Sequence, residues 1–261
     1  MRKYLVIGNP IEHSLSPKLH NRWIKDNNIN AIYDKKKLSK NDVKEVIDEL
    51  KNEKINGLNV TVPFKKYVIP FLDQLTPLAE EAQSVNTILK KNKKIIGDNT
   101  DIGGFVQSLK HMNYSVKNKK IFILGAGGVT SSIIVALKNL GIDKIIISNR
   151  TKEKAVELKN FYSNLEIVDW GETPDFDMII NTTSLGLKNT DKIKLNYGDI
   201  GSNKLFYDLI YNPAETDFLK RAMLSGNKIK NGKMMFIYQA QLAFKIWHNI
   251  LPKINEDLLN S

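Results

Sequence analysis

Residues 121–128 read IFILGAGG, and this stretch decides the fold of the second half of the chain. Four consecutive apolar residues are typical of a strand buried on both faces of a parallel sheet. Gly125 permits a tight turn, and Gly127 lets the backbone approach a pyrophosphate closely. A helix is expected from about Val129, and its free N–H groups and positive dipole end can bind phosphate groups. The stretch therefore predicts a dinucleotide-binding strand, turn and helix, with a ligand-free glycine-rich turn as the alternative.

The third glycine of the usual fingerprint is absent. Thr130, Ser131 and Ser132 fill that region instead. The third glycine serves close packing between helix and strand, and small side chains still allow such packing. The substitution therefore leaves the dinucleotide prediction in place.

The identity of the cofactor is indicated about twenty residues further on, where an NAD enzyme places Asp or Glu on the ribose 2′-hydroxyl. Here the strand KIIIS ends in Asn149, Arg150 and Thr151, followed by Lys152 and Lys154. No acid stands at the strand end. A guanidinium matches the geometry of a phosphate in two parallel hydrogen bonds. We therefore predict a strong preference for NADP.

Apolar runs of strand length alternate with helical patterns along the whole chain. This alternation predicts an α/β fold with parallel sheets and right-handed crossovers. Two lobes are expected, with a border near residues 101–104 and the active site in the cleft between them. Strands are expected at 4–8, 31–38, 57–63, 121–125, 144–149, 165–169, 178–183 and 205–210, with a hairpin around Asn92. Helices are expected at about 16–27, 41–51, 65–83, 102–112, 129–140, 152–162 and 233–250. Ser16 is expected to cap the first of them and Asn41 the second.

Composition excludes several classes of protein. The chain has no cysteine, so a disulfide framework, cysteine-ligated zinc and a cysteine nucleophile are excluded. No stretch approaches the roughly 20 apolar residues of a membrane span, and the N-terminal apolar run is too short for a signal peptide. We expect a cytoplasmic protein without a membrane partner.

The net charge is +11. A nucleic-acid binder is one interpretation of such a charge, and a lysine-rich solvated surface is another. The lysines are scattered, and no basic block lies beside interleaved aromatic residues, so we expect no nucleic-acid partner. A positive field also raises the local concentration of anionic small molecules. The sequence leaves open whether the protein is a monomer or a homodimer.

Five short polar segments stand at expected strand ends or helix starts. Uncharged hydroxyl and amide groups dominate them, and such groups suit a polyhydroxylated substrate, because each buried substrate hydroxyl needs a donor and an acceptor. Turn and cap chemistry explains any one segment but not five together. The segments are 12–17, 59–65, 85–87, 97–101 and 238–241.

These motifs, in this order, resemble shikimate dehydrogenases. The resemblance covers about residues 4–250 and rests on GNPIEHSLSPKLHN, GLNVTVPFK, SVNT, GDNTDIGGF, GAGG, NRT, NTTSLG, YDLIYNPAET and NGKMMFIYQAQLAFKIW. It implies two α/β lobes with the C-terminal helix returning to the first. Residues 1–101 with 236–261 would be the substrate-binding catalytic domain, and 102–235 a Rossmann-like NADP-binding domain. It also implies reversible oxidation of shikimate to 3-dehydroshikimate with NADP, a step toward chorismate and the aromatic amino acids.

The resemblance also implies residue roles. Lys65 and Asp101 would be the catalytic pair. The substrate contacts would be Ser14, Ser16, Thr61, Lys65, Asn86, Asp101, Tyr211 and Gln239. The cofactor contacts would be Gly125, Ala126, Gly127, Gly128, Val129, Asn149, Arg150, Thr151 and Lys154, with Leu209 and Gly232 flanking the nicotinamide. The chain differs from the family pattern at a few positions, and we expect these differences to affect local packing and not the chemistry. They are Gln83, Ser84, Leu209, Met234 and Phe236.

The chemistry can also be reasoned from the residues. Oxidation of a secondary alcohol moves a hydride from carbon while a proton leaves oxygen, and with no metal-ligand cluster visible a side chain must accept that proton. Lys65 follows a strand and Pro63, and we expect it to exchange a proton as a coupled pair with Asp101. His13, in a polar segment, is a minor candidate. Two alternatives remain: a quinate/shikimate dehydrogenase that accepts NAD, and a non-catalytic NADP sensor of the same fold.

Overall fold

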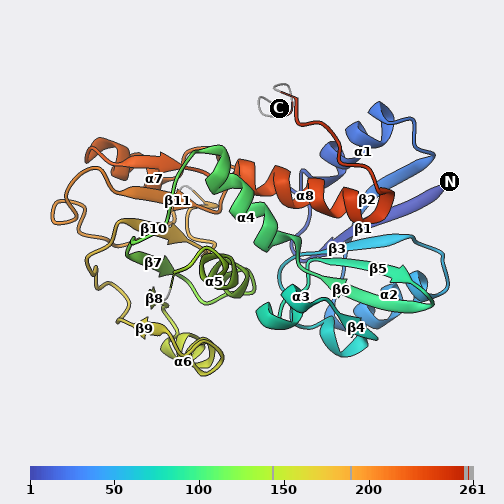
Figure 1. Cartoon of the computed structure of the whole chain (residues 1–261), viewed down its shortest axis with the longest axis horizontal. Coiled ribbons are helices and arrows are strands. Elements are labelled where there is room, and N and C mark those ends of the chain that lie inside the picture. The colour runs from blue at the N-terminus through green and yellow to red at the C-terminus, as the bar shows by residue number, and fades with distance from the viewer. Residues whose placement is uncertain (143, 189, 256–257, 259–261) are drawn as a thin grey trace. The chain divides into compact units, whose positions relative to one another are not determined.

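The computed structural model describes residues 1–142, 144–188, 190–255 and 258. The chain divides into two compact units (Figure 1). The first comprises Met1–Gln107 with Ile237–Ser261, and the second comprises Ser108–Phe236. No helix within the described residues is long and apolar enough to cross a membrane.

The first unit contains a six-stranded mixed sheet with the order β2-β1-β3-β5-β6-β4. β1 pairs in parallel with β2 and β3, β4 pairs in parallel with β6, and β5 runs antiparallel to both β3 and β6. The strands are β1 (Arg2–Gly8), β2 (Ala31–Lys37), β3 (Gly57–Val60), β4 (Gln74–Leu75), β5 (Thr87–Lys91) and β6 (Lys94–Asp98). The predicted hairpin around Asn92 is confirmed: Asn92 and Lys93 form its turn with positive φ angles of 51° and 65°. This hairpin makes the first sheet mixed instead of wholly parallel.

The helices of the first unit follow most of the predicted boundaries. They are α1 (Ser16–Asp26), α2 (Val43–Lys51), α3 (Pro77–Ala82), α4 (Thr100–His111) and α8 (Lys233–His248), the last two crossing the borders between the units. Two predictions are wrong. Asn41 does not cap α2. It lies inside a short 3₁₀ turn (Lys40–Asp42) that precedes α2 and begins with a capping box of Ser39 and Asp42. The continuous helix expected over 65–83 is absent, because Pro70 and Pro77 interrupt the backbone hydrogen bonds that it needs.

The first unit has its own core. The apolar stripe of α2, formed by Val43, Val46, Ile47 and Leu50, is buried together with residues of β3, β5 and β6. Gly57 of β3 lies against Trp247 of α8, whose Nε1 donates to the carbonyl oxygen of Ile88 at 3.2 Å. This packing anchors the C-terminal half of α8 on the sheet.

The second unit contains a six-stranded, wholly parallel sheet with the order β12-β11-β10-β7-β8-β9. Its strands are β7 (Ile121–Leu124), β8 (Ile145–Ser148), β9 (Leu165–Ile167), β10 (Met178–Asn181), β11 (Leu205–Asp208) and β12 (Lys228–Lys230). Its remaining helices are α5 (Thr130–Asn139), α6 (Lys152–Phe161) and α7 (Asp217–Leu224). The predicted strands are confirmed, whereas α7 and β12 were not foreseen. The strand order reverses at β7, the position where open α/β sheets bind ligands.

Aromatic residues fill one side of this second sheet. Phe122, Phe176, Phe206 and Phe218 lie in one buried cluster, with ring centroids of neighbouring pairs 5.2–6.0 Å apart. This core is separate from that of the first unit.

Candidate active site

Lys65 lies in the turn after β3. Its carbonyl oxygen accepts a hydrogen bond from the backbone N–H of Val85 at 2.9 Å, which fixes the turn to the segment before β5. The neighbouring Phe64 is buried. The Lys65 Nζ lies 2.5 Å from Asp101 Oδ2, and the two side chains are 10% and 7% exposed. A buried charge needs a partner, and these two side chains partner each other.

Asp101 stands in the first turn of α4, where the positive end of the helix dipole favours a carboxylate. Asn99 holds the start of this helix. Its Oδ1 accepts from the backbone N–H of Ile102 at 3.3 Å, and its Nδ2 donates to the carbonyl oxygen of Ser84 at 2.7 Å. The position of the carboxylate is therefore set by the fold and not by the ion pair alone.

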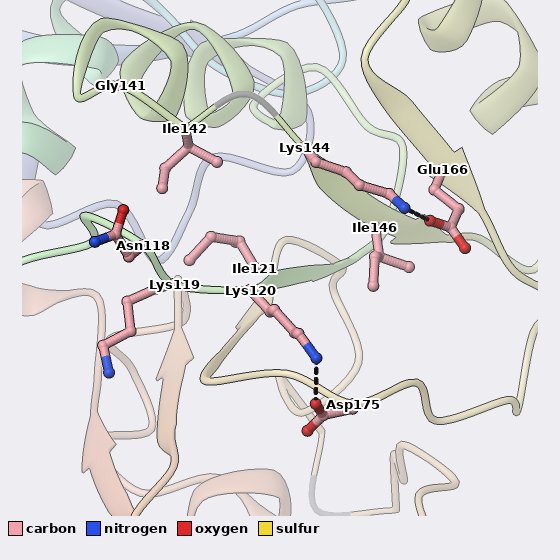
Figure 2. A pocket seen from close by; sticks show the side chains of 10 residues that line it. All are labelled: Asn118, Lys119, Lys120, Ile121, Gly141, Ile142, Lys144, Ile146, Glu166 and Asp175. Carbon is pink, nitrogen blue, oxygen red and sulfur yellow. Dashed lines mark hydrogen bonds and ion pairs between the residues drawn. The ribbon is translucent and has the colours of Figure 1, made fainter.

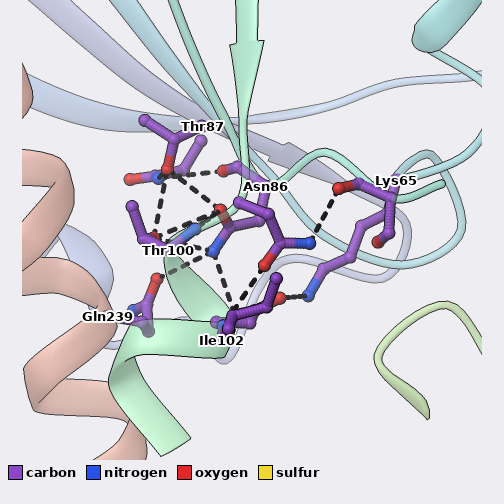
Figure 3. A network of polar contacts seen from close by, with 10 residues as sticks. Lys65, Asn86, Thr87, Thr100, Ile102 and Gln239 are labelled. Carbon is purple, nitrogen blue, oxygen red and sulfur yellow. Dashed lines mark hydrogen bonds and ion pairs between the residues drawn. The ribbon is translucent and has the colours of Figure 1, made fainter. Parts of the chain in front are cut away.

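Asn86 joins this pair to Thr100 of α4 and to Gln239 of α8 (Figure 3). Its Nδ2 donates to Asp101 Oδ1 and Thr100 Oγ1, both at 2.9 Å, and to Gln239 Oε1 of α8 at 3.3 Å. Its Oδ1 accepts from the backbone N–H of Thr100 at 2.7 Å. Four predicted site residues, Lys65, Asn86, Asp101 and Gln239, thus come together in one polar network, although 174 positions separate the first from the last in the chain.

The serine loop before α1 carries the next two predicted residues. Ser14 is half-buried, and its Oγ accepts from the backbone N–H of Ser16 at 3.3 Å. Ser16 is buried, and it does not cap α1 as the sequence predicts. Thr61 is half-buried after β3, where its backbone N–H donates to the carbonyl oxygen of Ile7 at 2.9 Å.

His13, the minor catalytic candidate, is exposed. Within the described part of the chain it makes no hydrogen bond or ion pair with Lys65 or Asp101. The loop around it is tied to β2 through Glu12. The carboxylate of Glu12 accepts from Lys37 Nζ at 2.8 Å, and this ammonium group lowers the pKa of Glu12 to about 2.

The glycine turn after β7 has the geometry that its sequence predicts. Gly125 has φ +109°, and a Cβ there would lie 2.6 Å from Thr182 Oγ1, so no larger residue fits. Ala126 N–H donates to Asn149 Oδ1 at 3.0 Å, which ties the turn to the end of β8. Gly127 differs: a Cβ there would meet no atom within 4 Å. Open space therefore lies beside the backbone at the start of α5.

Thr130, which stands at the position of the third glycine, holds the glycine turn together by hydrogen bonds. Its buried Oγ1 accepts from Gly127 N–H at 3.0 Å and lies 3.3 Å from the Gly125 carbonyl oxygen. It also lies 2.8 Å from Thr182 Oγ1, which in turn donates to the carbonyl oxygen of Leu124 at 2.8 Å. Sequence reasoning missed Thr182. Its place after the neighbouring strand β10 is the signal that could have found it.

Arg150, Thr151 and Lys154 lie at the end of β8 and the start of α6, and all three are exposed. Among the described residues, neither Arg150 nor Lys154 forms an ion pair or a side-chain hydrogen bond. Lys152 between them does: its Nζ lies 2.5 Å from Asp169 Oδ1. Two cations without partners therefore stand where the sequence predicts a phosphate contact.

Leu209 and Gly232 are in backbone contact. A Cβ on Gly232 would lie 2.1 Å from the Leu209 carbonyl oxygen, and Gly232 N–H donates to the carbonyl oxygen of Ile210 at 3.1 Å. The Tyr211 ring stacks on Phe236 with centroids 4.5 Å apart and planes 22° apart. Phe236, one of the positions that differ from the family pattern, therefore packs against the side chain of the predicted site residue Tyr211.

Asp208 is buried at the end of β11 and accepts hydrogen bonds from three different segments. Sequence reasoning placed it only within an expected strand. Its carboxylate accepts from Thr216 Oγ1 at 2.6 Å, Asn181 Nδ2 at 2.9 Å and Ile210 N–H at 3.0 Å. Burial raises the pKa of Asp208 to about 6. These hydrogen bonds fix the turn that carries Leu209 and Tyr211.

A pocket of about 450 Å³ lies at the amino ends of β7 and β8 (Figure 2). Each of its three lysines forms an ion pair: Lys120 with Asp175 and Lys144 with Glu166, both at 2.6 Å, and Lys119 with Asp177 at 3.7 Å. The pocket therefore differs from the end of β8, where Arg150 and Lys154 form no ion pair with the described residues. Across the described ranges, no group of three or more His, Cys, Asp or Glu side chains could hold a metal ion.

Comparison with known proteins assigns the chain to a family. Residues 6–88 match the model of the shikimate dehydrogenase substrate binding domain, and residues 107–186 match the model named shikimate / quinate 5-dehydrogenase. The chain is 60% identical over 259 residues to the NADP(+) shikimate dehydrogenase of Pelagibacter ubique, covering 99% of this chain and 98% of that protein. The chain belongs to the shikimate dehydrogenase family.

Solved structures of shikimate dehydrogenases have the same fold. That from Aquifex aeolicus is 38% identical, with a TM-score of 0.90 over 100% of this chain and 96% of its own. That from Thermus thermophilus, in complex with NADP(H) and shikimate, is 28% identical, with a TM-score of 0.89 over 97% of this chain and 95% of its own. The predicted α/β fold class and family are thus confirmed.

Proposed function

We propose that this chain is an NADP-dependent shikimate dehydrogenase, which reversibly reduces 3-dehydroshikimate to shikimate with NADPH on the route to chorismate. One observation carries the proposal: the enclosed Lys65–Asp101 pair, 2.5 Å apart and held by Asn86, in a chain of this family. An enclosed ammonium–carboxylate pair can give a proton to a ketone oxygen or take one from a hydroxyl group.

The proposed chemistry divides between cofactor and protein. When bound, NADPH supplies the hydride for the carbonyl carbon of the substrate. The Lys65–Asp101 pair gives one proton to the carbonyl oxygen, so that a hydroxyl group forms, and regains a proton from water. Asn86 holds Asp101 Oδ1, which leaves Oδ2 directed at Lys65. In the oxidation of shikimate the pair accepts the hydroxyl proton instead.

The remaining first-unit residues would orient the substrate. We assign the substrate carboxylate to Ser14 and Ser16, because two hydroxyl groups can donate to it. Hydroxyl groups of the ring would contact Thr61, Asn86 and Gln239. Tyr211 would be a further donor to the carboxylate. Hydroxyl and amide groups can both donate and accept, as such a substrate requires.

The second unit would hold NADP. The open space at Gly127 and the start of α5 fit a pyrophosphate, which the helix N-terminus attracts. The unpaired Arg150 and Lys154, next to Asn149 and Thr151, fit a 2′-phosphate. The other proposed contacts are Gly125, Ala126, Gly128, Val129, Leu209 and Gly232.

An absorbance assay of NADPH tests the proposal. Purified protein should reduce NADP with shikimate, and Lys65→Ala should lower kcat by about a hundredfold or more, the usual contribution of a positioned acid–base group. Asp101→Asn should also lower kcat. Lys66→Ala is the matched control, because the neighbouring Lys66 is exposed and lies outside the network. Near-normal turnover in Lys65→Ala would remove Lys65 from the catalytic role.

The same assay with quinate and with NAD tests the alternatives. The second family model carries quinate in its name, which favours testing that substrate. Comparable rates with quinate or NAD would indicate the broader enzyme. No reduction with any pair would indicate a non-catalytic NADP-binding protein.

We further propose that the partners are small molecules and not nucleic acid or membrane, and that the protein acts in the cytoplasm as a monomer or homodimer. The net charge of +11 suits anionic ligands such as NADP and shikimate.

A further inference from the structure

A buried tyrosine lies behind the proposed substrate site and has no role in the chemistry above. Tyr33 of β2 is 1% exposed, and its hydroxyl donates to Asn59 Oδ1 at 2.6 Å. We infer that Tyr33 is a positioning residue, which sets the orientation of Asn59 and, through Asn59, of the Asn86–Asp101 arm. The inference rests on the proposed function.

The arm toward the catalytic pair is continuous. Asn59 Nδ2 donates to Thr87 Oγ1 and to the Asn86 carbonyl oxygen, both at 3.0 Å. Thr87 Oγ1 donates to Asn86 Oδ1 at 3.1 Å, and Asn86 Nδ2 donates to Asp101 Oδ1 at 2.9 Å. Every link except the last is between uncharged groups, and every residue is buried.

The Tyr33 hydroxyl is the donor at the start of this arm. Burial raises the pKa of Tyr33 well above its ordinary value, so at neutral pH the hydroxyl keeps the proton that it donates to Asn59 Oδ1. Because Asn59 Oδ1 is held by Tyr33, Asn59 Nδ2 is directed at Thr87 and at the Asn86 carbonyl oxygen. Tyr33 therefore acts on the network proposed to hold the reacting hydroxyl group.

Aromatic packing fixes the position of the Tyr33 ring. His20 of α1 stacks on it with centroids 4.1 Å apart and planes 4° apart, and the Trp247 ring lies 6.1 Å away. Burial lowers the pKa of His20 to about 3, so the stacked imidazole is uncharged at neutral pH. The hydroxyl is thus presented by a rigid aromatic stack, which is the condition for a fixed hydrogen-bond geometry.

Tyr33→Phe removes only the hydroxyl group and tests the inference. We expect the KM for shikimate to rise about fivefold to tenfold, the change expected from loss of one uncharged hydrogen bond, and kcat to fall severalfold. The KM for NADP should stay within about twofold. Tyr4→Phe is the matched control: Tyr4 pairs with Tyr33 across β1 and β2, is equally buried and also packs near Trp247, 5.1 Å away. We expect it to keep both shikimate constants.

A double-mutant cycle with Asn59→Ala separates positioning from packing. If Tyr33 acts through Asn59, Tyr33→Phe should raise the KM for shikimate much less in the Asn59→Ala background than in wild type. Additive effects, or a lower Tm with unchanged KM and kcat, would assign Tyr33 a purely structural role and overturn the inference. A wild type that neither turns over nor binds shikimate overturns the proposed function as well, so the two failures are distinguishable.

Discussion

Arg150 and Lys152 are both exposed cations near the start of α6, yet their surroundings differ. Lys152 is held by Asp169 at 2.5 Å, whereas Arg150 has no partner among the residues that the structure describes. A partner-free guanidinium keeps all its donors for a ligand, and it binds phosphate in two parallel hydrogen bonds. At the residue scale, the ion pair therefore separates a cation that is available to bind phosphate, Arg150, from one that is already paired, Lys152.

This difference predicts cofactor selectivity. Arg150→Ala should raise the KM for NADP about tenfold or more, in the range of charged hydrogen bonds, and should change the KM for NAD little, because NAD lacks the 2′-phosphate. Lys152→Ala, the control, should affect both cofactors weakly. Initial rates with each cofactor at saturating shikimate measure the effect. Equal loss for both cofactors in Arg150→Ala would contradict the assignment of Arg150 to the 2′-phosphate.

At the scale of elements, the ends of β10 and β11 are joined by one buried carboxylate. Asp208 accepts hydrogen bonds from Asn181 at the end of β10, from Thr216 before α7 and from the backbone of Ile210. Burial raises its pKa to about 6, above the ordinary value near 4. Between these two values the folded protein retains a proton that the unfolded chain has released.

Stability should depend on pH through this group. The contribution of Asp208 to the free energy of unfolding is fully present below about pH 4 and is lost as the pH rises through about 6, by roughly 3 kcal/mol. Asp208→Asn does not titrate. The free energy of unfolding of the variant, measured relative to wild type by urea denaturation, should therefore rise between about pH 4 and pH 7. A difference that stays constant over this range would show that Asp208 does not titrate there.

At the scale of the whole molecule, the chain folds as two units, each with its own sheet and core. The proposed cofactor contacts all lie in the second unit. All proposed substrate contacts except Tyr211 lie in the first. Ligand binding stabilises the structure that forms the binding site, so each ligand should act mainly on one unit.

Hydrogen exchange can test this division. Saturating NADP alone should slow amide exchange in residues 121–154 and leave residues 57–65 and 99–105 nearly unchanged. Adding shikimate should then slow exchange in those two first-unit segments. The Lys66→Ala control should give the wild-type pattern. Equal protection of both units by NADP alone would contradict the assignment of one ligand to each unit.

Local patterns were enough to predict much of this protein. Apolar runs such as 121–124 report burial directly, and the glycine turn with Arg150 indicates its cofactor from short-range geometry. The hairpin at Asn92 follows from turn chemistry. The helix expected over 65–83 failed because two prolines outweighed the apolar periodicity. Asn41 is not a cap because the chain already turns at Lys40: the capping box of Ser39 and Asp42 begins a short 3₁₀ turn that contains Asn41 and leads into α2.

The sequence by itself determined the fold class, the family and the residue types of the site, because these depend on periodicity and on motifs a few residues long. Only the tertiary structure decided which groups meet. The joining of Asn86 to Gln239, the pairing of Lys65 with Asp101 and the hydrogen bond from Asn181 to Asp208 are contacts between segments that lie far apart in the sequence. A polar side chain has several possible partners along the chain, and packing brings only some of them within hydrogen-bond distance.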